Sequence, residues 1–135
     1  LFPYTTLFRS QVIDFGKFNL LDIRRHTMSK TFSIKTTKSQ NDQCTDGFKV
    51  SSSFYTEETL VEEDKALLIG NGLKLRLLDE NASPYTFNKY AEYADFTSDM
   101  LIYEKTYTAE LSSIAGTPIE AGPFDTVVLF KINYN

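Results

Sequence analysis

The chain has few side chains of the kind that carry out catalysis. His26 is its single histidine and Cys44 its single cysteine, so a Ser-His-Asp or Cys-His device would have to use His26. His26 lies in the polar stretch RRHTMSK, which is typical of an exposed loop, and Arg24-Arg25-His26 is interpreted as a solvated turn. We therefore expect no catalytic role for His26.

Carboxylates gather in one stretch, TEETLVEEDKALL, at residues 56–68. Metal sites need ligands at defined spacings, and a calcium loop needs regularly placed Asp and Asn with a glycine. This run is instead typical of a solvated face, and it comprises Glu57, Glu58, Glu62, Glu63 and Asp64. No two carboxylates stand out as a pair for glycoside cleavage. We expect neither an enzyme nor a bound metal or cofactor.

Gly70-Asn71-Gly72 is the one glycine-rich motif near a strand pattern. A phosphate-binding loop would continue into Lys-Ser/Thr and a helix, and neither follows here. The motif therefore predicts a β-turn, because Asn-Gly is a strong turn dipeptide.

Composition indicates one globular domain without nucleic-acid binding. The chain has 135 residues, is 41% hydrophobic and 24% charged, and has a formal net charge of -4. This length is enough for one domain with a core. The negative charge and the scattered Lys and Arg residues argue against a nucleic-acid partner. No apolar run approaches the roughly 20 residues of a membrane-spanning helix.

The elements that must position these residues are predicted to be strands. Alternation of apolar and polar residues, rich in β-branched and aromatic types, recurs along the chain and predicts strands. They are expected at 11–23, 31–37, 47–55, 72–78, 100–111 and 124–134. The acidic stretch 56–68 is expected to be a short helix or an extended loop, and 79–84 a loop. An all-β sandwich of about six or seven strands is the predicted fold class.

The C-terminal segment carries a set of motifs in a fixed order. They are Tyr107-Thr108-Ala109, the turn Ala121-Gly122-Pro123-Phe124, and a final alternation that ends in a penultimate tyrosine, Tyr134. This arrangement resembles the end of a chaperone–usher pilin, a fimbrial subunit of Gram-negative bacteria. Segments 13–18, 30–37, 47–54 and 70–87 resemble family elements in the same order. The resemblance thus covers residues 11–135.

This resemblance implies an incomplete immunoglobulin-like β-sandwich, the pilin fold, which lacks its final strand. A periplasmic chaperone would first fill the resulting groove, and an extension of the next pilin subunit would then replace it. The chaperone would hold the carboxylate of Asn135. The groove would be lined by Ile13, Phe15, Phe18, Phe124, Val128, Phe130, Ile132 and Tyr134.

The function implied by the resemblance is that of a structural fimbrial subunit that contributes to cell adhesion. Its partners would be other pilin subunits, the periplasmic chaperone, the outer-membrane usher, and host glycans through the assembled fimbria. The protein would be exported through the periplasm to the cell surface. Two alternatives are the C-terminal pilin domain of a two-domain tip adhesin and a stand-alone carbohydrate-binding sandwich. The latter would use exposed aromatics such as Tyr85, Tyr90 and Tyr93, which more simply pack a loop over the sandwich.

The resemblance also bears on Cys44 and on the first residues. It implies that Cys44 is half of a disulfide whose partner precedes or lies in the first strand, yet no cysteine precedes it. A lone cysteine is otherwise typical of a small buried side chain. The opening LFPYTTLFRS back-translates into a sequence that resembles a sequencing adapter. We expect residues 1–10 to be a non-native artefact joined to a truncated gene, and 11–135 to be the pilin domain.

Overall fold

The structure, a computed structural model, describes residues 4–6, 12–38, 48–97 and 102–134. Within them the chain forms one short helix and nine strands. The elements are β1 (Tyr4–Thr6), α1 (Leu20–Arg25), β2 (Met28–Lys38), β3 (Phe48–Tyr55), β4 (Leu60–Val61), β5 (Ala66–Gly70), β6 (Leu73–Leu78), β7 (Ala91–Phe96), β8 (Ile102–Ser113) and β9 (Leu129–Tyr134).

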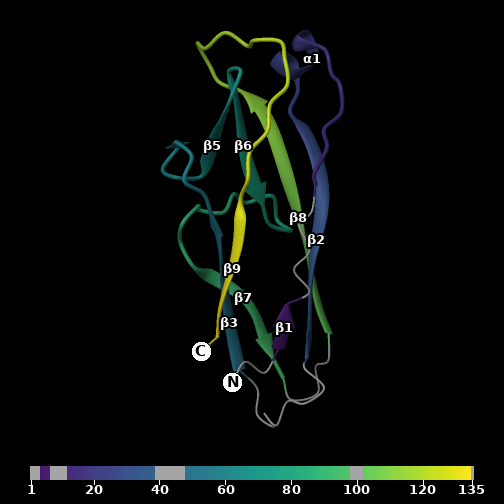
Figure 1. Cartoon of the computed structure of the whole chain (residues 1–135), viewed down its shortest axis with the longest axis vertical. Coiled ribbons are helices and arrows are strands. Elements are labelled where there is room, and N and C mark those ends of the chain that lie inside the picture. The colour runs from purple at the N-terminus through teal and green to yellow at the C-terminus, as the bar shows by residue number, and fades with distance from the viewer. Residues whose placement is uncertain (1–3, 7–11, 39–47, 98–101, 135) are drawn as a thin grey trace.

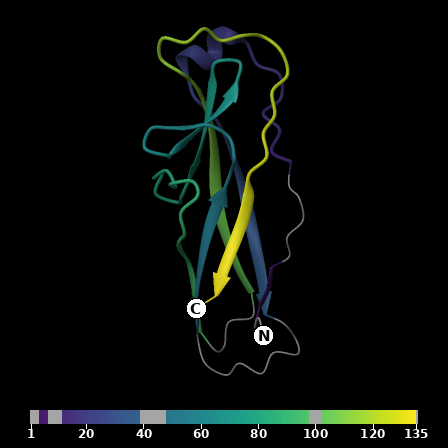
Figure 2. The same cartoon turned by 60° about the vertical axis from the view of Figure 1, so that its left-hand side comes forward.

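The strands form two antiparallel sheets that face each other along an elongated molecule (Figures 1 and 2). The larger sheet has the order β1-β2-β8-β6-β5-β4, and the smaller one has the order β7-β3-β9. Helix α1 and the turn between β5 and β6 lie at the same end of the molecule (Figure 1). We call this the α1 end. The predicted all-β fold class is confirmed.

Strand β6 illustrates how alternation builds the sandwich. Its residues Leu73, Leu75 and Leu77 are buried, whereas Lys74 and Arg76 between them lie half-buried on the outer face. This alternation is the one predicted for 72–78, and it follows from the two-residue period of a strand.

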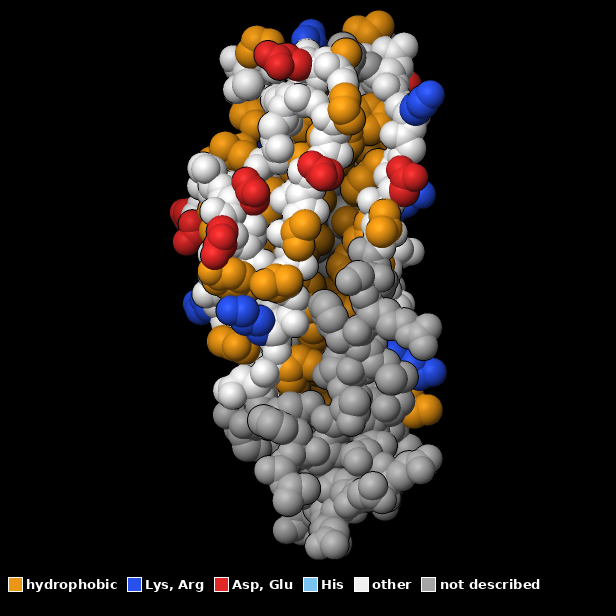
Figure 3. Space-filling model, viewed as in Figure 1, with side chains coloured by type: hydrophobic (Ala, Val, Ile, Leu, Met, Phe, Trp, Pro, Cys, Tyr) orange, Lys and Arg blue, Asp and Glu red, His pale blue; other side chains and the backbone are white. Residues whose placement is uncertain are grey.

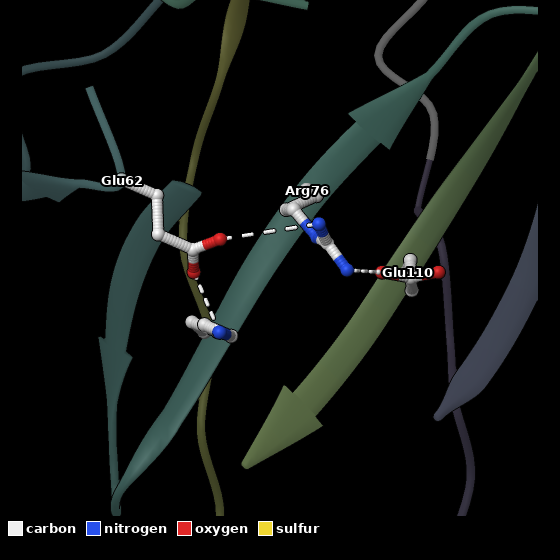
Figure 4. A network of polar contacts seen from close by, with 4 residues as sticks. Glu62, Arg76 and Glu110 are labelled. Carbon is white, nitrogen blue, oxygen red and sulfur yellow. Dashed lines mark ion pairs between the residues drawn. The ribbon is translucent and has the colours of Figure 1, made fainter. Parts of the chain in front are cut away.

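An ion-pair network lies on that outer face and ties the β4–β5 turn to two strands of the larger sheet (Figure 4). Glu62 contacts Lys74 Nζ at 2.6 Å and Arg76 at 3.9 Å, and Arg76 in turn contacts Glu110 of β8 at 2.6 Å. The charges of the acidic stretch are thus partly matched by cations of β6. Partly exposed ion pairs of this kind contribute at most about 1 kcal/mol each.

The space between the sheets is filled by aromatic side chains. Tyr107 of β8 lies near their centre, with ring centroids of Phe54, Phe32 and Tyr85 at 5.2, 5.3 and 5.6 Å. A second, smaller cluster lies toward the α1 end and contains Ile23, Leu73, Leu111 and Ile119. The core therefore has two parts, and the second part joins α1 to the larger sheet.

The prediction of a strand over 11–23 is wrong. Residues 12–19 have no strand pairing, and Leu20–Arg25 form α1. The cause is local, because the Asn19 side chain accepts a hydrogen bond from Leu21 N at 2.9 Å and caps the helix, as a good N-cap residue does. The predicted solvated turn at Arg24-Arg25-His26 is instead the end of this helix, although Arg24 and His26 are exposed as expected.

Three further elements differ from the predictions. The stretch 56–68, expected as a helix or loop, contains β4 and β5, which are joined by a turn with Glu62, Glu63 and Asp64 at positive φ. Strand β7 was not predicted, because its pattern of buried and exposed residues is irregular. The last strand begins at Leu129 rather than at residue 124, since the preceding segment is held by side-chain contacts and not by a ladder.

Candidate functional site

Strand β9 is one of the two edge strands of the smaller sheet within the described part of the chain, and β7 is the other. Strand β9 pairs with β3, with Phe130 opposite Phe54 and Ile132 opposite Ser52. The segment 12–19 lies across from the coil that leads into β9, and it runs toward the α1 end while β9 runs away from it (Figures 1 and 2). An edge strand of this kind presents backbone groups that can pair with a further strand.

An apolar groove runs between the segment 12–19 and the segment 124–132, which leads into β9. Seven of the predicted groove residues are half-buried, and all seven pack against the two core clusters. They are Ile13, Phe15 and Phe18 on one side and Phe124, Val128, Phe130 and Ile132 on the other. Figure 3 shows hydrophobic side chains along this hollow in the upper half of the view. The structure places these seven side chains against the two core clusters, and their role as a strand-accepting groove stays a prediction.

The two faces of the segment 124–132 differ in their exposure to solvent. The even-numbered residues face the core, whereas Val127 is 74% exposed, Leu129 is 47% exposed and Lys131 is exposed. Lys131 Nζ lies 3.8 Å from the centroid of the Tyr55 ring on the outer face. The even-numbered face is therefore the one that an occupant of the groove would cover.

The groove is closed at the α1 end by an aromatic contact. The ring centroids of Phe18 and Phe124 lie 5.9 Å apart with an interplanar angle of 53°. Both rings pack against the second core cluster. Because the two residues come from opposite sides of the groove, their contact bridges it.

One polar residue of the groove was missed by the sequence analysis. Thr126 lies on the even-numbered face between Phe124 and Val128 and is half-buried, and its Oγ1 atom is buried without a hydrogen-bond partner. Counting every second residue from Phe124 would have found it. The groove therefore has one polar position among its apolar ones.

The core beneath β9 includes a second buried hydroxyl. Tyr107 is 1% exposed and its hydroxyl has no hydrogen-bond partner. Burial, together with the nearby Tyr85, raises the pKa of Tyr107 above its usual value. Burial also raises the pKa of Tyr85 to about 12, with a further contribution from Asp79. These tyrosines are neutral packing groups at physiological pH.

The side chains of three predicted site residues lie outside the described part of the structure. The backbone of Tyr134 pairs with Val50, which extends β9 as predicted. Asn135 and Cys44 lie outside the described residues, and so do most of residues 1–10. The described residues 4–6 form β1, which pairs with Thr36–Lys38 at the edge of the larger sheet.

The described residues also bear on a metal site and on a membrane-spanning helix. Across residues 4–6, 12–38, 48–97 and 102–134, no group of three or more His, Cys, Asp or Glu residues could hold a metal ion. None of the helices described is long and apolar enough to cross a membrane.

The three tyrosines of the carbohydrate-binding alternative do not form an exposed platform. Tyr93 is 2% exposed, and Tyr85 is half-buried against Phe54, while Tyr90 is 48% exposed. Tyr85 and Tyr93 thus pack onto the sandwich. A flat stacking surface for a sugar would need several exposed rings together, and these three do not provide one.

Comparisons with known proteins identify the fold. No family model matches the sequence. The crystal structure of the P pilus rod subunit PapA is similar, with a TM-score of 0.77 at 18% identity over 98% of this chain and 99% of that chain. A chain in the structure of a chaperone–usher pilus is also similar, with a TM-score of 0.72 at 17% identity over 98% of this chain and 88% of that chain. The chain therefore has the immunoglobulin-like fold of these pilus subunits, as predicted.

Proposed function

We propose that this protein is a structural subunit of a chaperone–usher pilus, and that its groove accepts an extended strand from another protein. The observation that carries the proposal is the row of half-buried apolar residues that follows the edge strand β9. The similarity of the fold to a P pilus rod subunit supports it. The role is structural and involves no catalysis.

The physical basis is β-strand addition, in which a chain adds to an exposed sheet edge and inserts alternate side chains into pockets; pilin complementation is one of its known examples. An incoming strand would pair with β9 and place apolar side chains against Val128, Phe130 and Ile132. Each square ångström of apolar surface that it covers contributes roughly 25 cal/mol. The half-burial of the groove residues in the chain alone leaves this surface available.

Two partners occupy the same groove in succession in this proposal. A periplasmic chaperone occupies it first and prevents edge-to-edge aggregation, and the extension of the next pilin subunit replaces the chaperone at the outer-membrane usher. The assembled fimbria lies on the cell surface and contributes to adhesion, including contact with host glycans. Tyr134 and Asn135 serve as chaperone contacts in this proposal.

A pair of neighbouring valines tests the groove with a matched control. Val128 is half-buried on the groove face, and Val127 is 74% exposed on the opposite face. Val128→Asp should reduce co-purification of the full chain with a periplasmic pilus chaperone at least tenfold, because the new carboxylate would be desolvated under the bound strand. Val127→Asp should leave it near the wild-type level. Equal retention by both variants would refute the assignment of this face.

A further inference from the structure

The turn between β5 and β6 contacts the segment that leads into β9. Asn71 and Gly72 form this turn, with φ values of +55° and +76°, as two-residue hairpin turns require. Asn71 Nδ2 donates hydrogen bonds to the carbonyl oxygens of Gly122 at 3.3 Å and Pro123 at 3.1 Å. The side chain thus holds the two residues that directly precede Phe124.

Backbone contacts strengthen this attachment. Glu120 N donates to Asn71 O at 3.0 Å, and Ile114 N donates to Gly72 O at 3.2 Å. A Cβ atom at Gly72 would lie 2.2 Å from Pro118 O, so the two segments approach as closely as only glycine permits. The segment 114–123 is therefore fastened to the hairpin turn at several points.

The attachment determines where Phe124 lies. Phe124 follows the clamped Pro123 directly, and its ring contacts Phe18 at a centroid distance of 5.9 Å. Residues 124–128 have no strand pairing that could hold them instead. Asn71 itself lies outside the groove, at the turn of another hairpin, and so acts on the groove only through the segment that it holds.

We propose that Asn71 is a positioning residue that holds an end wall of the groove, formed by Phe18 and Phe124, and that this wall sets the register of the bound strand. The second half of the proposal rests on the proposed function. A groove with uniform apolar walls accepts a strand in registers that differ by two residues, because side chains repeat with that period. A closed end removes this freedom, since a strand that slides too far meets the two rings.

Two substitutions separate the side-chain contact from the turn itself. Asn71→Gly removes the donor and keeps a residue that accepts positive φ. Asn71→Asp keeps a short side chain that tolerates this conformation but cannot donate. Asn81→Asp is the matched control, because Asn81 is exposed in the loop after β6.

The wall can be tested in the full chain without any partner. In wild-type protein and Asn81→Asp, NMR should show cross-peaks between the rings of Phe18 and Phe124. In Asn71→Gly and Asn71→Asp these cross-peaks should disappear, while those between β3 and β9 remain. Survival of the ring contact in both Asn71 variants would overturn the positioning role.

The register is tested with a synthetic peptide of alternating Val and Lys that carries a photoreactive benzoylphenylalanine at one end. Crosslinks mapped by mass spectrometry should fall at one location in wild-type protein and Asn81→Asp. In the Asn71 variants they should spread over positions two residues apart. A single location in every variant would overturn the role of the wall in register.

The two tests separate the proposals from each other. If wild-type protein binds no peptide and no chaperone, the proposed function fails and the register half fails with it. The ring contact then still decides whether Asn71 holds the wall. If the peptide binds but the register does not depend on Asn71, the proposed function stands and only the register half is wrong.

Discussion

Tyr107 combines four aromatic neighbours in the core with a hydroxyl that has no hydrogen-bond partner. It is 1% exposed, and its ring lies within 6.4 Å of Phe32, Phe54, Tyr85 and Phe130, measured between centroids. A buried hydroxyl without a hydrogen bond carries a desolvation cost of about 1–3 kcal/mol. Its ring therefore stabilises the sandwich, and its hydroxyl does not.

Tyr107→Phe should accordingly leave the free energy of unfolding unchanged or raise it by about 1 kcal/mol. Tyr93→Phe is the matched control, because the Tyr93 hydroxyl donates to Ile34 O at 3.4 Å. That substitution should lower the free energy of unfolding by up to about 1 kcal/mol. Urea unfolding of both variants measures the difference. A larger loss for Tyr107→Phe than for Tyr93→Phe would show that Tyr107 has a partner.

The same residues give a pH dependence at the alkaline end. Burial raises the pKa of Tyr85 from 10.0 to about 12 and raises the pKa of Tyr107 as well. Above pH 10 the unfolded chain loses these protons before the folded chain does, so folding stability is full below pH 10 and falls as the pH rises. The free energy of unfolding should decrease from pH 10 to 12, and less steeply in Tyr107→Phe. Identical slopes would contradict the burial of this hydroxyl.

At the scale of elements, the β5–β6 turn joins parts of the chain that are far apart in sequence. Gly72 and Gly116 have nearly equal φ values, +76° and +77°, but only Gly72 lies against a neighbour, Pro118. The two glycines therefore separate the cost of a positive φ from the cost of a steric clash.

Gly116→Ala should lower the free energy of unfolding by about 1 kcal/mol, because alanine is disfavoured at positive φ. Gly72→Ala should lower it by about 1–3 kcal/mol more, since its Cβ would force the 114–119 segment to move. Thermal or urea unfolding of the pair measures the difference. Equal losses would mean that the hairpin turn does not press against this segment.

Sequence patterns predicted the elements in which one face is buried. The predicted strands 31–37, 47–55, 72–78 and 100–111 overlap β2, β3, β6 and β8 in the described residues, because burial on one face imposes a two-residue period. The period alone could not distinguish a paired strand from an extended segment. Residues 12–19 and 124–128 half-bury several apolar side chains but pair with no strand. Asn19 caps the helix that follows the first segment, and Asn71 donates to the residue that precedes the second.

The candidate site could be predicted in part, because burial of one face gives the last strand a two-residue period as well. The parity of the last strand identified Phe124, Val128, Phe130 and Ile132, which all face the core. Thr126 was not among the predicted groove residues, because its side chain is polar. The contact of Asn71 with Pro123 spans 52 positions, and no local pattern encodes such a long-range hydrogen bond.

At the scale of the whole molecule, the chain is a sandwich whose smaller sheet ends at β9. The larger sheet has six strands and the smaller one has three, so the core is covered unevenly. The apolar side chains of the groove remain half-buried at this border. A strand added beside β9 would widen the smaller sheet and bury them, which couples binding of a partner to the stability of the domain.

The most direct test is the unfolding of the full chain alone and in the presence of a periplasmic pilus chaperone or of a strand peptide with alternating apolar residues. We expect low stability for the chain alone and an unfolding midpoint that rises with partner concentration, because a ligand that binds only the folded state stabilises it by mass action. A stable, cooperative monomer whose unfolding midpoint ignores both partners would contradict the proposal that the groove accepts a strand.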